Sequence, residues 1–399
     1  MRLDCSQDFE TDEREQQKGE PMKQSSQRIL TTHTGSLPRP HDLHQMLEAQ
    51  DRGEAVDNAI FERRVQEAVN AIVQQEASCG IDVVNDGEMS KISYSTYVKN
   101  RLTGFGGTSQ RPATAPPDVA DFPGYAQRMA IQLSDYKMPA CNGPISYVGM
   151  EAVQRDCANL KTALQKVDVT EAFITAASPG VIARFLDNLY YPSHEAYLFA
   201  LADAMKVEYD TIYQAGFVLQ LDCPDLTGNR DIPGAGKGTS YLALHIEALN
   251  HALRDIPADR MRLHLCWGNY EGPHHRDIPL RDIINSVLQA RPAALSFEAA
   301  NPRHEHEWKV FEEVKLPEGK ILIPGVLDST TNFIEHPELV AQRITHFTSL
   351  VGRENVIAGT DCGFATFAGF HAVDPQIAWA KLRAMVEGAQ IASQELWQG

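Results

Sequence analysis

Short apolar runs alternate with amphipathic segments along most of the chain. In segments 61–77, 193–216 and 240–255 the apolar residues recur every three to four positions, which is the spacing of one buried helix face. Eight strands that alternate with such helices predict an α/β fold with a parallel sheet, and its simplest closed form is a single (β/α)8 barrel. An open doubly wound sheet is the alternative. The runs that predict strands are Ile29–Thr34, Ile81–Asp86, Pro144–Val148, Phe217–Asp222, Arg262–Trp267, Ala293–Glu298, Ile321–Leu327 and Val356–Asp361.

The beginning of the chain has a different composition. Residues 1–27 are polar and charged and show no apolar periodicity, so we predict a disordered tail followed by one barrel domain over 28–399. The first residues contain no apolar segment of the kind found in a signal peptide. The seven cysteines are few and odd in number. We therefore expect a cytoplasmic protein with free or metal-bound thiols and no disulfide framework.

The charge of the chain excludes two classes of partner. There are 53 acidic and 36 basic residues, for a formal charge of −17, and the basic residues form no run. Proteins that bind the phosphate backbone of nucleic acids usually carry a basic surface, so no nucleic-acid partner is expected. The apolar runs are shorter than the roughly 18 residues that a membrane helix needs. No membrane partner is expected either.

Four residues with metal-binding side chains lie at predicted strand ends. His264 and Cys266 are two positions apart in a strand, so their side chains point to the same face. Glu298 follows Cys266 by 32 residues, and Cys362 follows Glu298 by 64 residues, which is about one and two β/α units. The carboxyl ends of barrel strands meet at one rim, where active sites are built. Two thiols, one imidazole and one carboxylate predict a tetrahedral Zn²⁺ site, because soft sulfur ligands disfavour Mg²⁺ and Ca²⁺.

This ligand set suits the chemistry of thiols. A coordinated thiol loses its proton at neutral pH and remains a nucleophile toward an electrophilic carbon. The sulfur of the substrate must join or displace a ligand, and we expect Glu298, the hardest of the four ligands, to yield. The alternative is a pair of buried thiols, a core histidine and an unrelated acid.

From Ile29 almost to its end, the chain resembles the cobalamin-independent methionine synthase family, specifically the C-terminal catalytic barrel of that family. The motifs LHLCWGNY (263–270), SFEAANPR (296–303) and GTDCGF (359–364) resemble its zinc-ligand motifs. The resemblance therefore implies a zinc-dependent methyl- or alkyltransferase whose acceptor is a small thiol.

Three further motifs imply how the thiol is held. TTHTGSLPRP (31–40) resembles the motif that binds the amino-acid part of homocysteine, which places Gly35 and Ser36 at the substrate. DVVNDGEMSKISY (82–94) and LQLDCPDL (219–226) resemble the motifs that supply two acids, here Glu88 and Asp222. These acids would pair with the ammonium group of homocysteine.

Two departures from the family concern the methyl donor. Full-length members contain two barrels, and this sequence has room for one. Thr330 stands where the family has a histidine that acts at the folate stage. We therefore expect a donor other than tetrahydrofolate, and a separate protein such as a methylated corrinoid carrier would account for the missing barrel.

Other functions of similar barrels are alternatives. The epoxyalkane–coenzyme M transferases activate a thiol that bears a sulfonate, for which Arg39 or Arg303 would have to outweigh the two acids. A zinc-bound barrel that only senses thiols would not need Ser36, Glu88 and Asp222. A metal-free barrel resembling uroporphyrinogen decarboxylase would not need the cysteines.

Two smaller expectations concern the surroundings of the site. The histidines of segments 274–275 and 304–306 are expected in solvated loops or at the substrate rim. Asp361 precedes Cys362 directly and is expected to support the metal ligands.

Overall fold

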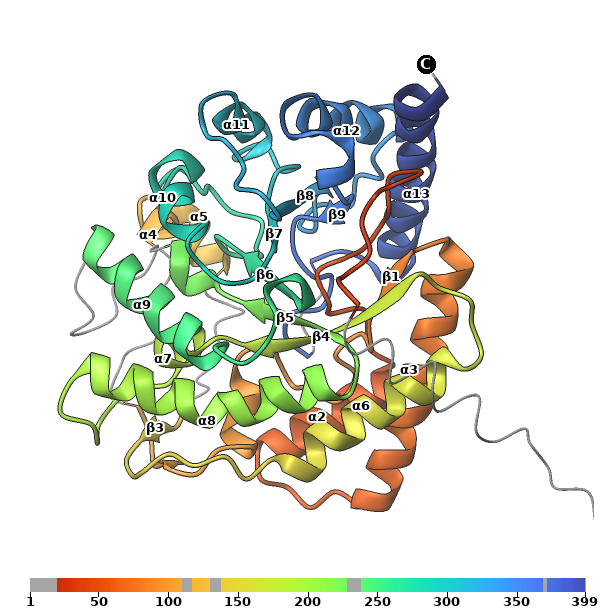
Figure 1. Ribbon diagram of the computed structural model, residues 1–399. Helices are drawn as coiled ribbons and strands as arrows, with labels where there is room; N and C mark the ends of the chain where they lie inside the picture. Colours follow the sequence, from red (N-terminus) through yellow and green to blue (C-terminus); the bar gives the residue numbers. More distant parts are fainter. Residues whose placement is uncertain (1–19, 110–116, 130–137, 228–237, 369–371, 399) are drawn as a thin grey trace, which may run out of the picture.

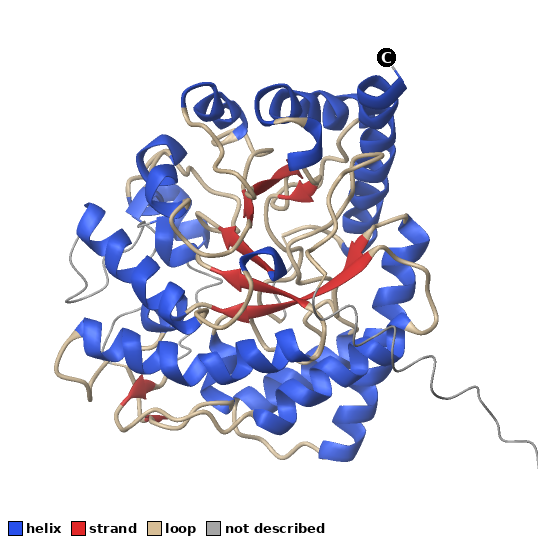
Figure 2. Ribbon diagram, in the orientation of Figure 1, coloured by secondary structure: helices blue, strands red, loops and turns tan. Residues whose placement is uncertain are grey.

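The computed structural model describes residues 20–109, 117–129, 138–227, 238–368 and 372–398. Within these residues, seven parallel strands form one curled sheet in the order β1-β4-β5-β6-β7-β8-β9, with helices packed around it (Figures 1 and 2). The strands are β1 (Val83–Val84), β4 (Glu171–Ala177), β5 (Val218–Asp222), β6 (Met261–Leu265), β7 (Ala294–Phe297), β8 (Ile321–Leu327) and β9 (Gly359–Thr360).

The N-terminal segment closes this sheet into a barrel. Thr31 pairs in parallel with Ala358, next to β9, and Thr32 pairs in parallel with Val83 of β1. Residues 31 and 32 therefore lie between β1 and β9 and take the place of the eighth strand of the barrel. The predicted (β/α)8 barrel is confirmed.

One predicted strand is wrong and one was missed. Residues 144–148 form a loop in which Tyr147 makes a single antiparallel bridge to Leu102. The barrel strand that the sequence did not predict is β4, which pairs in parallel with both β1 and β5. Its sequence, EAFITAA, contains three alanines, and alanine is depleted in strands, so its composition indicates a strand only weakly.

Helices cover the outside of the barrel. The predicted helical segments 61–77, 193–216 and 240–255 correspond to α3, α8 and α9. Asp57 caps α3 by accepting from Ile60 N at 3.0 Å, and Ser193 caps α8 in the same way. No helix in the described part of the chain is long and apolar enough to span a membrane. The α-helices are α2 (His41–Asp51), α3 (Asn58–Cys79), α4 (Pro117–Ala120), α5 (Pro123–Met129), α6 (Met150–Leu164), α7 (Pro179–Phe185), α8 (His194–Gln214), α9 (Gly238–Ala252), α10 (Leu280–Val287), α11 (Val310–Glu313), α12 (Pro337–Val351) and α13 (Pro375–Gln398).

Shorter elements complete the described structure. A small antiparallel sheet joins β2 (Phe105–Gly106) to β3 (Ala140–Cys141). The 3₁₀ helices are η2 (Thr96–Asn100), η4 (Pro224–Thr227), η5 (Ala258–Arg260), η6 (Glu305–Lys309) and η7 (Arg353–Asn355).

The inside of the barrel is layered by polarity. At the amino ends of the strands, Phe173 and Val218 are neighbours in a small apolar cluster. The next row pairs Gln220 with Arg262, and Arg262 lies over the ring of Phe173 at 4.1 Å. Burial lowers the pKa of Arg262 to about 9. Polarity thus increases toward the carboxyl ends of the strands.

Residues 20–27, which were predicted to belong to the tail, pack against the other end of the barrel. Met22 is buried and its N–H donates to Asp259 O at 2.9 Å. The hydroxyl of Ser25 donates to Val356 O at 2.6 Å. The predicted boundary at residue 28 is therefore too late for these eight residues, while residues 1–19 lie outside the described residues.

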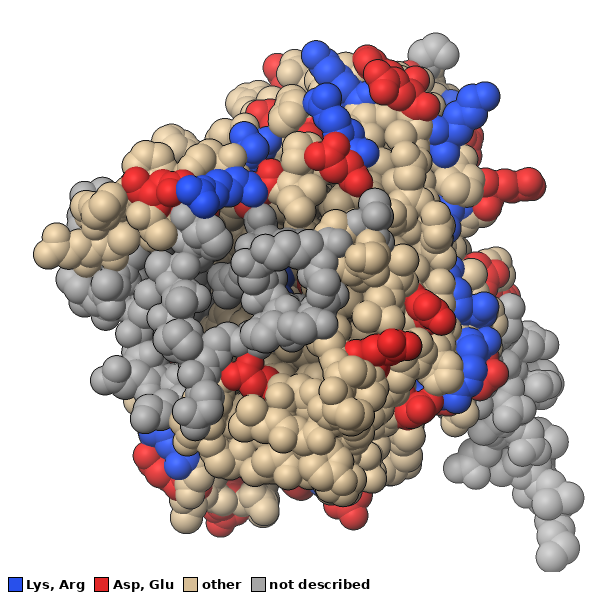
Figure 3. All heavy atoms as spheres, turned by 90° about the vertical axis from the view of Figure 1, so that its left-hand side faces the viewer, with Lys and Arg blue, Asp and Glu red and all other residues tan. Residues whose placement is uncertain are grey.

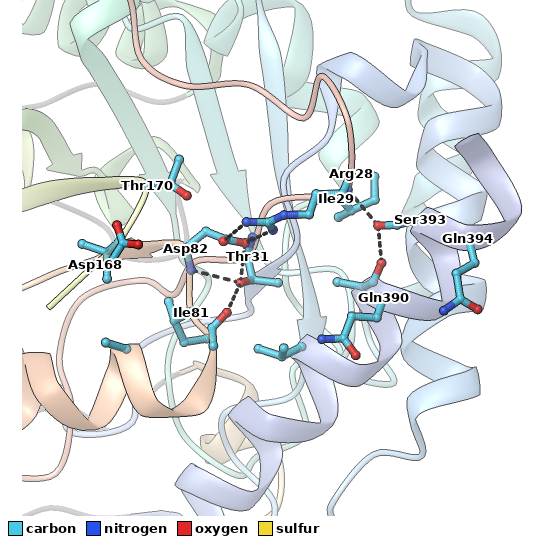
Figure 4. Close-up of a pocket in the computed structure, with 15 residues that line it drawn as sticks. Arg28, Ile29, Thr31, Ile81, Asp82, Asp168, Thr170, Gln390, Ser393 and Gln394 are labelled. Atoms are coloured by element: carbon cyan, nitrogen blue, oxygen red, sulfur yellow. Dashed lines mark hydrogen bonds and ion pairs between the residues drawn. The ribbon is translucent and has the colours of Figure 1, made fainter. Parts of the chain in front are cut away.

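A cavity of about 580 Å³ lies at this amino-terminal end, between α3 and α13 (Figure 4). Its polar side chains bind one another. Arg28 forms an ion pair with Asp82, and Asp82 also accepts from Thr31 N at 2.8 Å. The hydroxyl of Ser393 accepts from Ile29 N at 2.9 Å. The side chains that line the cavity hold residues 28–31 in place. We therefore infer that these side chains stabilise the closure of the barrel and do not form a ligand site.

Asp82→Ala is expected to destabilise the fold by about 1–3 kcal/mol, because it leaves the buried backbone N–H of Thr31 without its acceptor. Urea unfolding should show a lower midpoint with an unchanged m-value. The exposed Asp168 lines the same cavity, so Asp168→Ala is the matched control and should unfold like the wild type. Equal midpoints for the Asp82→Ala and Asp168→Ala variants would contradict this account of the closure.

Candidate metal centre and substrate site

The parallel register aligns the candidate residues at the carboxyl end of the barrel. Asp222 of β5 is paired with His264 of β6, and His264 is paired with Ser296 of β7, so these three side chains point in one direction. Cys266 directly follows β6, and Cys362 lies two residues after β9. Every one of these side chains is buried.

His264, Cys266 and Cys362 form a compact set. One ligand atom from each lies within 4.8 Å of the others, and the two sulfurs are 3.6 Å apart without a disulfide. Two sulfurs bound at about 2.3 Å to one tetrahedral ion would be about 3.8 Å apart, which agrees with the observed distance. The imidazole of His264 also has one ring nitrogen available to bind a metal. Its Nδ1 hydrogen-bonds to Ser296 Oγ at 3.1 Å, while its buried Nε2 has no hydrogen-bond partner among the described residues.

The two thiols are electrostatically coupled. A hydrogen bond from Cys362 lowers the pKa of Cys266 to about 7, although burial opposes this shift. The same hydrogen bond, together with burial, raises the pKa of Cys362 above its ordinary range. One thiolate is therefore stabilised at the expense of the other. A second thiolate at this distance requires a cation between the sulfurs, which the donor set fits.

Glu298 lies beside the compact set. Its Oε1 accepts from Trp267 N at 2.7 Å, and its Oε2 accepts from Asn301 Nδ2 at 2.9 Å. Its carboxyl group is also a minor cause of the lowered pKa of Cys266. A carboxylate oxygen has two lone pairs, so these contacts leave it able to bind a metal.

Asp361 holds the loop that carries Glu298. Its carboxylate accepts from the backbone N–H groups of Ala299, Ala300 and Asn301 at 2.7–2.8 Å. Because Asn301 in turn donates to Glu298, Asp361 connects the end of β9 to the end of β7.

The segment around Gly35 lies against Glu88. A Cβ atom at Gly35 would be 2.6 Å from Thr175 Cγ2 and 3.1 Å from Glu88 Oε1, and the φ of Gly35 is +142°. Ser36 is buried, and its carbonyl accepts from Phe364 N at 2.9 Å. The fold therefore brings Gly35, which precedes Ser36, next to Glu88, and their role at a substrate site stays a prediction.

The two carboxyl oxygens of Glu88 have different surroundings. Lys91 donates to Thr175 Oγ1 at 3.0 Å, and an ammonium group cannot accept, so the Thr175 hydroxyl proton points to Glu88 Oε1 at 2.8 Å. Its other oxygen, Oε2, accepts no hydrogen bond among the described residues and lies 3.8 Å from Arg39 Nη2. Glu88 adopts a left-handed φ of 57°, an uncommon conformation that is found most often at functional sites.

The pKa of Asp222 depends on the nearby Glu88. Burial, followed by the nearby charge of Glu88, raises the pKa of Asp222 well above its usual value. Gln220 opposes this shift by donating to Asp222 Oδ1 at 2.8 Å. Two buried carboxylates that repel each other form a site that favours a cationic group.

The two candidate arginines differ in position. Arg39 is buried and donates to the backbone oxygens of Glu88 and Ala365 at 3.0 and 2.6 Å, so its charge is committed to the Glu88 loop. Arg303 is half-exposed and donates to His275 O at 3.3 Å. The structure thus places Arg303 on the outer loops rather than beside Glu88.

Sequence reasoning missed a buried cluster of histidines beside Glu298. His304 was expected in a solvated loop or at the substrate rim; it is 2% exposed, so it is not solvated, and it lies between Asp277 and Glu307, at 3.2 and 2.8 Å. Burial disfavours the charged ring, yet these two hydrogen bonds outweigh burial and raise the pKa of His304 to about 10. His274 also bonds to Asp277 at 2.7 Å. The spacing of His304 and Glu307 by three residues was the available signal.

The loop after β8 and the charge distribution on one face of the molecule were also subjects of prediction. Thr330 folds back and donates through its hydroxyl to Asp328 at 2.8 Å, so the loop after β8 presents a hydroxyl and a carboxylate. On the side of the molecule that carries α4, α5 and α9, acidic and basic side chains are interspersed, and the described basic residues form no continuous stripe (Figure 3).

Comparisons with known proteins agree with this geometry. The family model described as "Cobalamin-independent synthase, Catalytic domain" matches residues 191–391, a range that includes Asp222 and all four predicted metal ligands. The methionine synthase of Thermococcus kodakarensis is 24% identical over 369 residues, covering 92% of this chain and 94% of that protein. That of Saccharolobus solfataricus is 25% identical over 372 residues, covering 92% and 96%. A solved B12-independent methionine synthase from a Shewanella species shares the fold with a TM-score of 0.70 at 19% identity, covering 93% of this chain and all of that chain.

The raised pKa of His304 predicts a pH-dependent stability. Because the folded value of about 10 exceeds the unfolded value of about 6.5, the stabilisation is complete below pH 6.5 and is lost as the pH rises toward 10. His304→Gln should therefore flatten the decline of the unfolding free energy over this range, measured by urea unfolding at several pH values. The exposed His306 gives the control, and His306→Gln should keep the wild-type slope. Identical slopes for the wild type and His304→Gln would show that His304 is not charged in the folded protein.

Proposed function

This chain belongs to the family of cobalamin-independent synthase catalytic domains, a family of methyltransferases, and we propose that it transfers a methyl or alkyl group to the sulfur of a Zn²⁺-bound thiol. The proposed acceptor is homocysteine. The observation that carries the proposal is the buried set of His264 Nε2 and two sulfurs 3.6 Å apart, with two carboxylates in the same electrostatic field.

His264, Cys266 and Cys362 would hold the metal, with Glu298 as the fourth ligand. When bound, Zn²⁺ would keep the substrate thiol deprotonated at neutral pH. Ser296 keeps the His264 ring oriented with Nε2 available. Glu298 already has partners in Trp267 and Asn301, so it can leave the ligand set without becoming an unpaired buried charge.

Glu88 and Asp222 support the choice of an amino-bearing thiol. An ammonium group between them would relieve their repulsion and lower the raised pKa of Asp222. A sulfonate in the same place would add a third negative charge. The backbone of Gly35 and the buried Ser36 would lie beside the remainder of the amino-acid group.

The source of the transferred group follows from the loop after β8. Thr330 and Asp328 hydrogen-bond to each other there and provide no imidazole. We infer that position 330 supplies no histidine for activating the donor, and we propose a donor other than tetrahydrofolate, such as a separate methylated carrier protein.

The metal ligands predict a clear pattern of metal content. The wild type should contain about one zinc per chain by elemental analysis, and Cys266→Ala and Cys362→Ala should lose it, because each removes a thiolate ligand. Cys141 is equally buried and lies outside the set, so Cys141→Ala should retain the metal. A wild type that is purified with protected thiols and lacks zinc would overturn the proposed mechanism.

The two acids predict which thiol is bound. Glu88→Gln and Asp222→Asn should weaken homocysteine binding about tenfold or more, since each removes a charged partner of the ammonium group. Calorimetry on the zinc-loaded protein measures this, with coenzyme M as the comparison ligand. Arg303→Ala should leave homocysteine binding unchanged. Tight binding of coenzyme M that depends on Arg303, without binding of homocysteine, would replace the proposed substrate by a sulfonate thiol.

A further inference from the structure

One buried carboxylate, that of Glu76 near the end of α3, contacts both loops that carry the proposed substrate residues. Its Oε1 lies 2.5 Å from His33 Nε2 and accepts from Asn85 N at 3.0 Å. His33 precedes Gly35 by two residues, and Asn85 precedes Glu88 by three. Glu76 is completely buried, and a buried carboxylate is costly unless its hydrogen bonds are satisfied. Its position at the junction of the two loops therefore needs an explanation.

The first arm of this arrangement runs through the ring of His33 to Gly35. The backbone N–H of Gly35 donates to His33 Nδ1 at 3.2 Å. A neutral imidazole carries one proton, so Nδ1 accepts and Nε2 holds the proton that is donated to Glu76. Burial lowers the pKa of His33 to about 3, which agrees with a neutral ring. The orientation of the Gly35 peptide is thus set from α3.

The second arm runs through Asn85 to the turn that carries Glu88. The side-chain oxygen of Asn85 accepts from Gly87 N at 2.6 Å, and its amide donates to Phe173 O at 3.2 Å. Gly87 and Glu88 both have left-handed φ values, 65° and 57°. This conformation is unfavourable for a glutamate, so the surrounding hydrogen bonds must impose it.

The two arms meet again at the substrate side. A Cβ atom at Gly35 would be only 3.1 Å from Glu88 Oε1, so the two loops are in contact at this point. A displacement of either loop changes the space between the Gly35 peptide and the carboxylate. The contacts of Glu76 determine that separation from outside the site.

We propose that Glu76 and His33 are positioning residues for the amino-acid end of the thiol substrate, with one carboxylate holding the Gly35–Ser36 segment and Glu88 at a fixed separation. This inference rests on the proposed function, because it concerns the same substrate. Neither residue is placed at the metal or at the reacting sulfur. Their loss should therefore affect recognition of the amino-acid group and leave metal binding intact.

The test compares two thiols in matched variants of the zinc-loaded protein. Glu76→Leu should weaken the binding of homocysteine by about 10-fold to 100-fold, the scale of a displacement of about 1 Å. The binding of 2-mercaptoethanol, which has no amino-acid group, should change less than about twofold, and the zinc content should stay the same. Glu76→Gln should restore homocysteine binding, because its amide oxygen can accept from both His33 and Asn85.

One control separates positioning from general damage. Glu171 pairs with Arg260 at the opposite end of the barrel, so Glu171→Leu should alter stability without altering the preference between the two thiols. Equal losses for both thiols in Glu76→Leu, or a Glu76→Gln variant as weak as Glu76→Leu, would overturn the proposal.

A second measurement tests the arrangement when no thiol is bound. Nitrogen-15 spectra of labelled histidine should show His33 with a protonated Nε2 and an unprotonated Nδ1 in the wild type and in Glu76→Gln. A proton on Nδ1 would refute the arrangement directly. If the wild type binds neither thiol, the proposed function fails, and the tautomer of His33 still decides whether Glu76 orients the Gly35 loop.

Discussion

The closure of the barrel by residues 31 and 32 is the constraint on which the rest of the structure depends. These residues lie between β1 and β9, so the loop that follows them enters the same rim as the ends of the other strands. The parallel register then places Asp222, His264 and Ser296 in one row. The closure also brings Gly35, which follows residues 31 and 32, next to Glu88.

The carboxyl ends of the barrel strands carry ionisable and metal-binding side chains that are costly to bury. Two neighbouring thiols, the carboxyl groups of Glu88 and Asp222, and an imidazole whose Nε2 has no partner among the described residues are buried there. Such a site is stable when cations complete it, one among the sulfurs and one between the acids. A divalent metal and the ammonium group of a thiol substrate would meet these two requirements, which is why the geometry favours homocysteine over a sulfonate thiol.

The sequence predicted what depends on local pattern and missed what depends on tertiary contacts. Seven of the eight barrel strands carry apolar runs that were recognised in the sequence. His264, Cys266 and Cys362 could be placed together because parallel strands end at one rim. The alanine-rich β4 was missed because alanine is not typical of strands, and only the pairing of β4 with β1 and β5 shows that it belongs to the sheet.

The supporting contacts of the site were less predictable. The pKa of His304 is raised because Asp277 and Glu307 hydrogen-bond to its ring, and Asp277 comes from another loop. Glu76 occupies an otherwise apolar helix face, and only the folded structure shows that His33 and Asn85 meet it. Such contacts join residues far apart in sequence, so no pattern of spacing reveals them.

X-ray absorption at the zinc edge, with and without homocysteine, tests the central claim most directly. The account predicts two sulfur ligands and two nitrogen or oxygen ligands in the free protein, with a third sulfur replacing one oxygen when homocysteine is added. A shell that keeps two sulfurs in the presence of saturating homocysteine would contradict activation of the thiol by the metal.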